Sequence, residues 1–164
     1  MPELPEIEIV KQSLDKNIKF EKIKKVVVRN RSLRFKIPKN FEIALKNKKI
    51  KKISRKSKYI ILDLGDVYCV FHLGMSGTIH LINRKNYNKN TNTSFYSSSD
   101  LPLKHNHIEF LLNNYQLIYN DPRRFGFFKI LKKKDLSNFF KNVGPEPLNK
   151  NFNISYICNY FINK

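Results

Sequence analysis

The opening residues of the chain are of types that can perform covalent chemistry at an amino terminus. The sequence begins Met1-Pro2-Glu3, and a small second residue normally permits removal of the initiator methionine. Pro2 would then be a free secondary amine that titrates near neutrality, and its neutral form is a good nucleophile toward an electrophilic carbon. Glu3 adjoins that nitrogen and can move a proton or stabilise positive charge on a sugar. The alternative is structural: Pro2 starts a helix whose positive end is stabilised by Glu3 and Glu6.

Two further strings place side chains where they could enter a ligand. Met75 lies between glycines in the stretch 74–77; glycines let the backbone approach a ligand, and an exposed methionine can act as a wedge. A tight turn after Asp121-Pro122 contains Arg123, Arg124 and Phe125. Alternatively, Phe125 belongs to the core, as lone aromatic residues usually do, and Arg123 pairs with Asp121.

His105 and His107 could share one face of a strand, where a metal pair is geometrically possible. Because no set of further cysteine and carboxylate ligands accompanies this pair, no metal site is predicted. The two cysteines, Cys69 and Cys158, are far apart and form neither a metal-ligand spacing nor a disulfide framework. This usage favours a reducing compartment.

The hydrophobic pattern predicts the elements that position these residues. A helix is expected over 6–17, with Ile7, Val10 and Leu14 on one face. Strands are predicted at 23–28, 59–64, 67–73, 78–82, 107–112, 116–120 and 126–131, with hairpin turns at 65–66 and 113–114. Short helices at 40–48 and 135–140, a polar loop over 83–102 and a helix over 153–164 complete the pattern. Short strands with turn signals predict an antiparallel sandwich or barrel led by a helix.

The composition indicates a polyanionic partner. The 164 residues include 32 Lys and Arg against 13 Asp and Glu, which gives a formal net charge of +19. Nucleic acid is the first candidate and an anionic membrane surface the second. The alternative explanation of the positive charge is compositional drift, because an AT-rich genome raises the content of Lys, Asn, Ile, Phe and Tyr. Because the sequence has neither a cationic, apolar leader nor an apolar stretch of membrane-spanning length, a cytosolic protein is expected.

Six strings, in order along essentially the whole chain, carry a family resemblance. They are PELPEIE at 2–8, RKSKY at 55–59, HLGMSG at 72–77, KHNH at 104–107, DPRRFG at 121–126 and GPEPL at 144–148. Together they resemble the N-terminal catalytic domain of bacterial formamidopyrimidine-DNA glycosylases, the Fpg/Nei family. Endonuclease VIII, the sister group, usually has glycine where this chain has Leu4.

The resemblance implies a role for each matching residue. Pro2 attacks the sugar C1′ of the damaged nucleotide and forms a Schiff base, Glu3 acts in acid–base catalysis at the sugar, and Lys58 donates a proton during β-elimination. Met75, Arg123 and Phe125 fill the space left when the base flips out, which offsets part of the cost of flipping. His72, His105, Arg124 and Lys164 resemble phosphate-contacting positions. For Lys58, the alternative is one more cation in a basic stretch.

The resemblance also implies a fold, a reaction and missing parts. The fold is α+β and mainly β: a two-layer antiparallel β-sandwich with an N-terminal helix over 1–148, followed at 149–164 by the start of a helix–two-turn–helix module. The reaction excises oxidised purines such as 8-oxoguanine or formamidopyrimidines and then cleaves the strand by β/δ-elimination. No cofactor is expected in this chain, because the four-cysteine zinc finger of the family is absent from the sequence.

The expected partner is double-stranded DNA with oxidised purines or abasic sites, bound by a monomer in the bacterial cytoplasm at the nucleoid, without membrane association. Three alternatives stay open. The chain is a truncated, inactive or merely DNA-binding remnant; it is a basic RNA- or ribosome-associated protein; or it has the oxidised-pyrimidine specificity of endonuclease VIII. Leu4 and the set Met75, Arg123 and Phe125 argue against the last.

Overall fold

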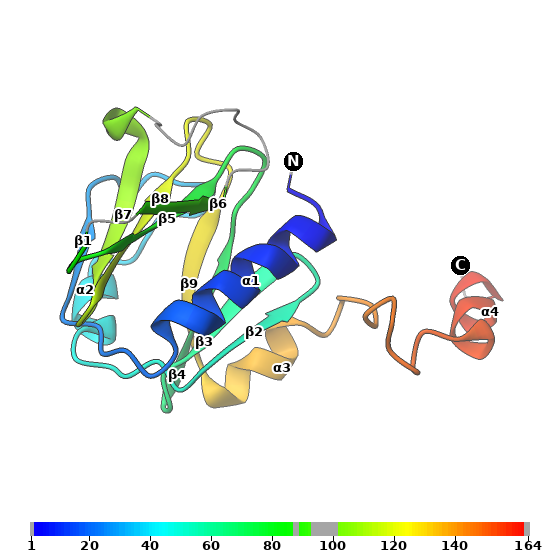
Figure 1. Ribbon diagram of the computed structural model, residues 1–164. Helices are drawn as coiled ribbons and strands as arrows, with labels where there is room; N and C mark the ends of the chain where they lie inside the picture. Colours follow the sequence, from blue (N-terminus) through cyan, green and yellow to red (C-terminus); the bar gives the residue numbers. More distant parts are fainter. Residues whose placement is uncertain (1, 87–88, 93–101, 163–164) are drawn as a thin grey trace.

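Two antiparallel sheets form the body of the molecule in the computed structural model, which describes residues 2–86, 89–92 and 102–162 (Figure 1). One sheet has the strand order β1-β7-β8-β5-β6 and the other the order β2-β3-β4-β9. The strands are β1 (Lys25–Val28), β2 (Lys52–Lys56), β3 (Tyr59–Asp63), β4 (Val67–His72), β5 (Thr78–Asn83), β6 (Lys89–Asn92), β7 (Asn106–Leu111), β8 (Tyr115–Asn120) and β9 (Phe127–Lys132). The expected α+β sandwich is confirmed.

Helices cover the sandwich and follow it. They are α1 (Leu4–Ile18), α2 (Phe41–Leu45), α3 (Leu136–Phe139) and α4 (Ile154–Ile162), with 3₁₀ turns η1 (Leu103–His105) and η2 (Lys133–Asp135). Helix α1 begins after Glu3, which forms a reciprocal capping box with Glu6 that satisfies backbone N–H groups at the helix start. Its buried residues Ile7, Val10, Leu14 and Ile18 repeat at helical spacing.

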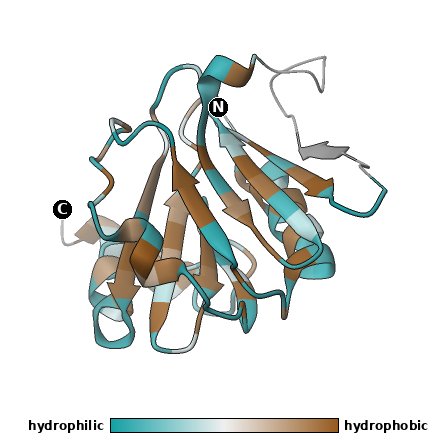
Figure 2. Cartoon of the chain, turned by 90° about the vertical axis from the view of Figure 1, so that its left-hand side faces the viewer, coloured by the Kyte–Doolittle hydropathy of each residue, from teal (hydrophilic) through white to brown (hydrophobic). Residues whose placement is uncertain are grey.

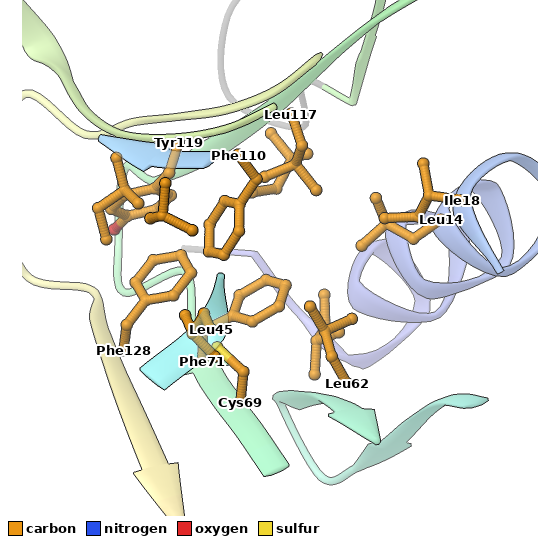
Figure 3. Packing of buried hydrophobic residues seen from close by; sticks show 14 of the residues in the cluster. Leu14, Ile18, Leu45, Leu62, Cys69, Phe71, Phe110, Leu117, Tyr119 and Phe128 are labelled. Atoms are coloured by element: carbon orange, nitrogen blue, oxygen red, sulfur yellow. The ribbon is translucent and has the colours of Figure 1, made fainter. Parts of the chain in front are cut away.

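The core lies between the two sheets and beneath α1. Figure 2 shows apolar residues recurring along the strands of both sheets. In Figure 3, Phe110, Leu117 and Tyr119 of one sheet face Phe71 and Phe128 of the other. The Phe71 and Phe128 rings stack at 4.8 Å between centroids, and the Tyr119 ring meets Phe128 edge-on at 5.0 Å. This aromatic centre fixes how the sheets pack, because interiors tolerate few voids.

Two strands depart from the sequence prediction. Strand β2 pairs with β3 throughout, although the sequence reads there as a basic stretch with one apolar residue; only Ile53 of β2 is buried. Strand β6, which pairs with β5, lies inside the predicted polar loop over 83–102. Both strands are held by backbone pairing with an apolar neighbour, and hydrophobic alternation does not reveal such pairing. The rest of that loop lies partly outside the described residues.

Helix α4 follows the sandwich after a connecting segment that contains several turns (Figure 1). None of its residues is buried, and Ile154, Phe161 and Ile162 expose 70% or more of their surface. The predicted division into 1–148 and 149–164 stays a prediction. Within the described residues, no helix has the length and apolar character needed to cross a membrane.

Candidate active site

A cavity of about 380 Å³ opens at the start of α1. Its lining includes Glu3, Lys58 and Glu146, from three segments that are distant in the sequence. Glu3 caps α1, Lys58 lies in the turn between β2 and β3, and Glu146 belongs to the GPEP segment after α3. The structure therefore brings together the predicted acid–base residue and the predicted proton donor.

Pro2, the predicted nucleophile, is buried directly before Glu3. It is not among the residues that line the 380 Å³ cavity. Glu3, however, does line this cavity, and its covalent link to Pro2 keeps the proline nitrogen within a few bonds of it. While Met1 is attached, this nitrogen is a tertiary amide and carries no nucleophilic lone pair, so chemistry at Pro2 requires an unblocked terminus.

An ion-pair network that the sequence analysis did not identify holds this cavity together. The Arg55 guanidinium donates to Glu8 on α1 at 2.8 Å and to Glu146 at 2.7 Å, and its side chain is only 15% exposed. The second Glu146 oxygen accepts the backbone N–H of Ser57 at 2.5 Å. Arg55 therefore links the helix that follows Glu3, the turn that carries Lys58 and the GPEP segment.

Both carboxylates of this network have lowered pKa values. Burial raises the pKa of Glu146, but the Ser57 N–H and Arg55 outweigh it, so the pKa is lowered from 4.5. The pKa of Glu8 is lowered mainly by its hydrogen bond with Arg55. A carboxylate with a lowered pKa in the folded state stabilises the fold above its unfolded-state pKa, and this contribution is lost as the pH falls toward the folded-state value.

We expect Arg55→Met to destabilise the protein at neutral pH by about 2 kcal/mol, because it removes charge-assisted hydrogen bonds to two partly buried carboxylates. The thermal midpoint should fall by roughly 5 °C at pH 7. As the pH falls below about 4.5 toward the lowered pKa values of Glu8 and Glu146 in the wild type, the difference in stability between variant and wild type should shrink. Thermal unfolding followed by circular dichroism at several pH values measures both effects.

Arg29→Met is the matched control, since Arg29 pairs with Glu109 at 2.6 Å but its side chain is 58% exposed. Exposed pairs contribute little, so this variant should melt close to wild type at every pH. Equal losses for the two variants, or a loss in Arg55→Met that does not change with pH, would contradict the proposed role of the network.

A second cavity, of about 670 Å³, gathers the residues predicted to enter DNA. Met75, Arg123 and Phe125 all line it. Each exposes more than a third of its surface, and the Arg123 guanidinium lies 4.6 Å from the centre of the Phe125 ring. Phe125 is 42% exposed and so is not a core residue. The predicted phosphate-contacting residues His72 and Arg124 line the same cavity, together with Arg34.

Asp121 organises the two loops that present these side chains. It is 0% exposed, and its carboxylate accepts hydrogen bonds from the Ser76 hydroxyl at 2.5 Å and the Tyr119 hydroxyl at 2.8 Å. It also accepts the backbone N–H groups of Arg123 at 3.2 Å and Gly126 at 3.0 Å. The suggested pairing of Arg123 with Asp121 therefore exists through the Arg123 main chain, which leaves the guanidinium free to stack on Phe125.

The backbones of the two loops are in close contact. Gly74 has φ +73°, and a Cβ atom there would lie 2.5 Å from the backbone nitrogen of Gly126. Arg124 also has positive φ, at 59°, which is uncommon for a residue with a side chain. Glycine thus allows the approach, and the unusual turn directs three consecutive exposed side chains, Arg123 to Phe125, away from the core.

His72 lines the 670 Å³ cavity and lies on the strand next to the turn that carries Lys58. It pairs with Tyr59, the residue after Lys58, across the β3–β4 ladder. Burial lowers its pKa, and the nearby charges of Lys58 and Arg34 lower it further, which favours the neutral ring. Its Nδ1 accepts the Gly74 N–H at 2.9 Å, so the neutral ring carries its hydrogen on Nε2. A neutral Nε2–H donor suits contact with a phosphate oxygen.

Of the two remaining predicted contacts, His105 can be placed, and it lines neither cavity. His105 ends η1, and its carbonyl accepts the Asp121 N–H at 3.0 Å, which puts it beside the 121–126 turn. Lys164 lies outside the described residues. His107 is buried, with Nε2 2.7 Å from the Asp121 carbonyl. Within residues 2–86, 89–92 and 102–162, no three His, Cys, Asp or Glu side chains are placed to hold a metal ion.

Sequence reasoning missed the residues that support the site rather than line it. Arg55, Glu146 and Asp121 lie inside strings that were singled out, yet none was assigned a supporting role. Local sequence gives no signal of these roles, because Arg55 lies in a basic stretch and Glu146 and Asp121 adjoin prolines. Glu8 and Ser76 also lie inside such strings, Glu8 at the expected positive end of the first helix, but neither was assigned a partner.

Comparisons with known proteins agree with this geometry. Residues 1–128 match the family model described as formamidopyrimidine-DNA glycosylase N-terminal domain. A formamidopyrimidine-DNA glycosylase of Wolbachia pipientis from Culex pipiens is 39% identical over 159 residues, which cover 96% of this chain and 54% of that protein. One from Haemophilus influenzae (strain PittEE) is 38% identical over 158 residues, covering 96% and 53%. The chain thus spans about half the length of the curated relatives it matches.

Solved structures give the same result. The formamidopyrimidine-DNA glycosylase of Lactococcus lactis, bound non-covalently to DNA containing an AP site, matches with a TM-score of 0.81 and 27% identity over 99% of this chain and 58% of that one. A T221P mutant of the same enzyme with Fapy-dG DNA matches with a TM-score of 0.74 and 30% identity over 89% and 50%. With the family model matching residues 1–128 of 164, the chain belongs to the formamidopyrimidine-DNA glycosylase family.

Proposed function

We propose that this chain is the catalytic portion of a bifunctional DNA glycosylase and AP lyase that removes oxidised purines. The observation that carries the proposal is that five of the six strings converge on two cavities, one lined by His72 and the other by Lys58, whose charge acts on the His72 ring. One cavity holds acid–base groups beside the amino terminus. The other holds exposed side chains that can enter a duplex. The expected partner is double-stranded DNA with oxidised purines or abasic sites, in the bacterial cytoplasm.

In the proposed reaction, the Pro2 nitrogen forms a bond to C1′ while the bond between C1′ and the damaged base breaks. The base leaves with a proton, and the opened sugar remains as an iminium on Pro2. Removal of a C2′ proton then expels the 3′ phosphate, and a second elimination releases the 5′ phosphate. In this proposal Glu3 exchanges protons at the sugar and Lys58 donates one during elimination, which is supported by their lining the same cavity. Splitting the cleavage into covalent steps lowers each barrier.

Borohydride trapping tests this function directly. The 164-residue chain, with methionine removal verified by mass, is incubated with an abasic duplex and with duplexes carrying 8-oxoguanine or an oxidised pyrimidine. We expect a covalent protein–DNA adduct on the abasic and 8-oxoguanine duplexes. Preferential trapping on the oxidised pyrimidine would instead support endonuclease VIII-like specificity. Salt-dependent binding to DNA without any adduct would indicate a DNA-binding remnant.

A further inference from the structure

A third cavity adjoins the one that holds Met75 and Phe125. It has a volume of about 220 Å³, and its lining includes Arg34, Phe35, His72, Lys129 and Phe139; we call it the Lys129 groove. Arg34 and His72 line both this groove and the 670 Å³ cavity. The Arg34 N–H also donates to the Gly126 carbonyl at 3.2 Å, which ties its loop to the 121–126 turn. The two hollows therefore form one continuous surface.

Aromatic rings hold the Lys129 ammonium in a defined place. It lies 4.6 Å from the centre of the Phe35 ring, 5.4 Å from that of Phe139 and 5.9 Å from that of Phe127. The Arg34 guanidinium lies 5.8 Å from the Phe35 ring on the same surface. Rings attract a cation but neutralise none of its charge, so the ammonium keeps its donors for a ligand.

Negative charge is missing around these two cations. None of the residues that line the Lys129 groove is acidic. Among the described residues, the ion pairs involve Lys11, Arg29, Arg31, Lys48 and Arg55, and neither Arg34 nor Lys129 has a carboxylate partner. Two cations on a shared aromatic surface form an uncompensated positive site, which is complementary to an anion with an apolar neighbour. A DNA phosphate flanked by deoxyribose has that chemistry.

We propose that the Lys129 groove binds a backbone phosphate of the DNA outside the lesion itself, with its deoxyribose against the exposed Phe35 ring. The strand would run from the cavity of Met75 past His72 and Arg34 to Lys129. The inference rests on the proposed function insofar as DNA is the ligand. It adds a phosphate subsite, formed by Arg34, Phe35 and Lys129, to the sequence-predicted contacts.

Salt-dependent binding tests the subsite. Fluorescence anisotropy measures the affinity of the 164-residue chain for an uncleavable abasic-analogue duplex between about 50 and 200 mM salt. Lys129→Ala and Arg34→Ala should each weaken binding several-fold and lower the slope of log K against log salt by about 1. Lys132→Ala is the control: it makes the same charge change on the same strand, at an exposed residue outside the groove. It should change the slope much less.

Shortened duplexes show whether the contact is local. If the duplex is trimmed stepwise on either side of the abasic analogue, the difference between wild type and Lys129→Ala should vanish once the DNA no longer reaches the groove. Equal slopes for Lys129→Ala and Lys132→Ala, or a difference that survives on the shortest duplex, would overturn the proposal. Equal Lys129 dependence on a matched RNA duplex would overturn the assignment to DNA.

The test separates this inference from the catalytic proposal, because binding does not need Pro2. A changed salt slope without any borohydride adduct would support the groove and reject catalysis. Normal adduct formation on saturating abasic duplex, together with equal salt slopes for Lys129→Ala and Lys132→Ala, would support catalysis and reject the groove.

Discussion

Pro2→Gly, with methionine removal confirmed by mass, is expected to lose ~100-fold or more of the rate at which a borohydride-stable adduct forms with abasic DNA. A secondary amine gives a permanently charged iminium, which draws electrons from the sugar without further protonation. The pyrrolidine ring also fixes φ before the capped start of α1. Glycine retains an amine but loses both properties. Gel analysis of adducts under single-turnover conditions gives the rate.

A second experiment blocks the Pro2 nitrogen without replacing any side chain. A chain with an uncleaved amino-terminal extension has its Pro2 nitrogen in an amide bond, and it should form no adduct until the extension is removed to leave Pro2 first. Both versions should bind undamaged duplex equally, since the cations of the cavities are unchanged. Adduct formation by the extended chain would show that another amine, such as Lys58, is the nucleophile.

Asp121→Ala is expected to give the largest loss of stability, about 3–5 kcal/mol, since it leaves two hydroxyls and two N–H groups without their buried acceptor. Asp121→Asn should be milder, because one carboxamide oxygen can still accept while the NH₂ group faces donors. If Asp121→Asn folds, its affinity for an abasic-analogue duplex should fall at least ~10-fold, because the loops bearing Met75, Arg123 and Phe125 lose their common support. Binding to undamaged duplex should change little.

The contrast between the two duplexes identifies a positioning role. A merely unstable protein would lose both affinities in proportion to its folded fraction, whereas a misplaced set of inserting side chains affects only the duplex with a gap to fill. Asp66→Asn, at a 63% exposed carboxylate in the β3–β4 turn, is the control and should match wild type in thermal unfolding and binding. Unchanged affinity of a folded Asp121→Asn for the abasic duplex would contradict the assignment.

Much of the fold was predictable because its elements follow simple periodicities. The spacing of Ile7, Val10 and Leu14 predicts α1, and the alternating or apolar runs divided by Gly65-Asp66 and Asn113-Asn114 predict two hairpins that the structure confirms. Strands β2 and β6 were missed because their stability comes from backbone pairing with a neighbour. Local sequence carries little information about a partner strand that is defined only after folding.

The residues of the candidate site also fall into those that the sequence identifies and those that it does not. Residues that would act on a ligand, such as Lys58 and Met75, were identified because they recur in strings typical of the family, and the structure places them at cavities. Their roles stay predictions. The supporting residues Arg55, Glu146 and Asp121 were not identified, since their significance lies in pairings across 91 residues, for Arg55 with Glu146, and 45 residues, for Asp121 with Ser76. One sequence cannot reveal such partners without the fold.

The β3–β4 hairpin has a mechanical consequence for the site. Its open end carries Lys58 just before Tyr59 on one arm and the Gly74 loop just after His72 on the other, and Tyr59 and His72 face each other on the same rung. The spacing between Lys58 and the loop that carries Met75 is thus set by a single residue pair of the ladder and is independent of how long the two strands are. Residues can therefore be added or removed at the Gly65-Asp66 turn, at the other end of the hairpin. Such changes lengthen or shorten the two strands without altering the spacing between Lys58 and the Gly74 loop.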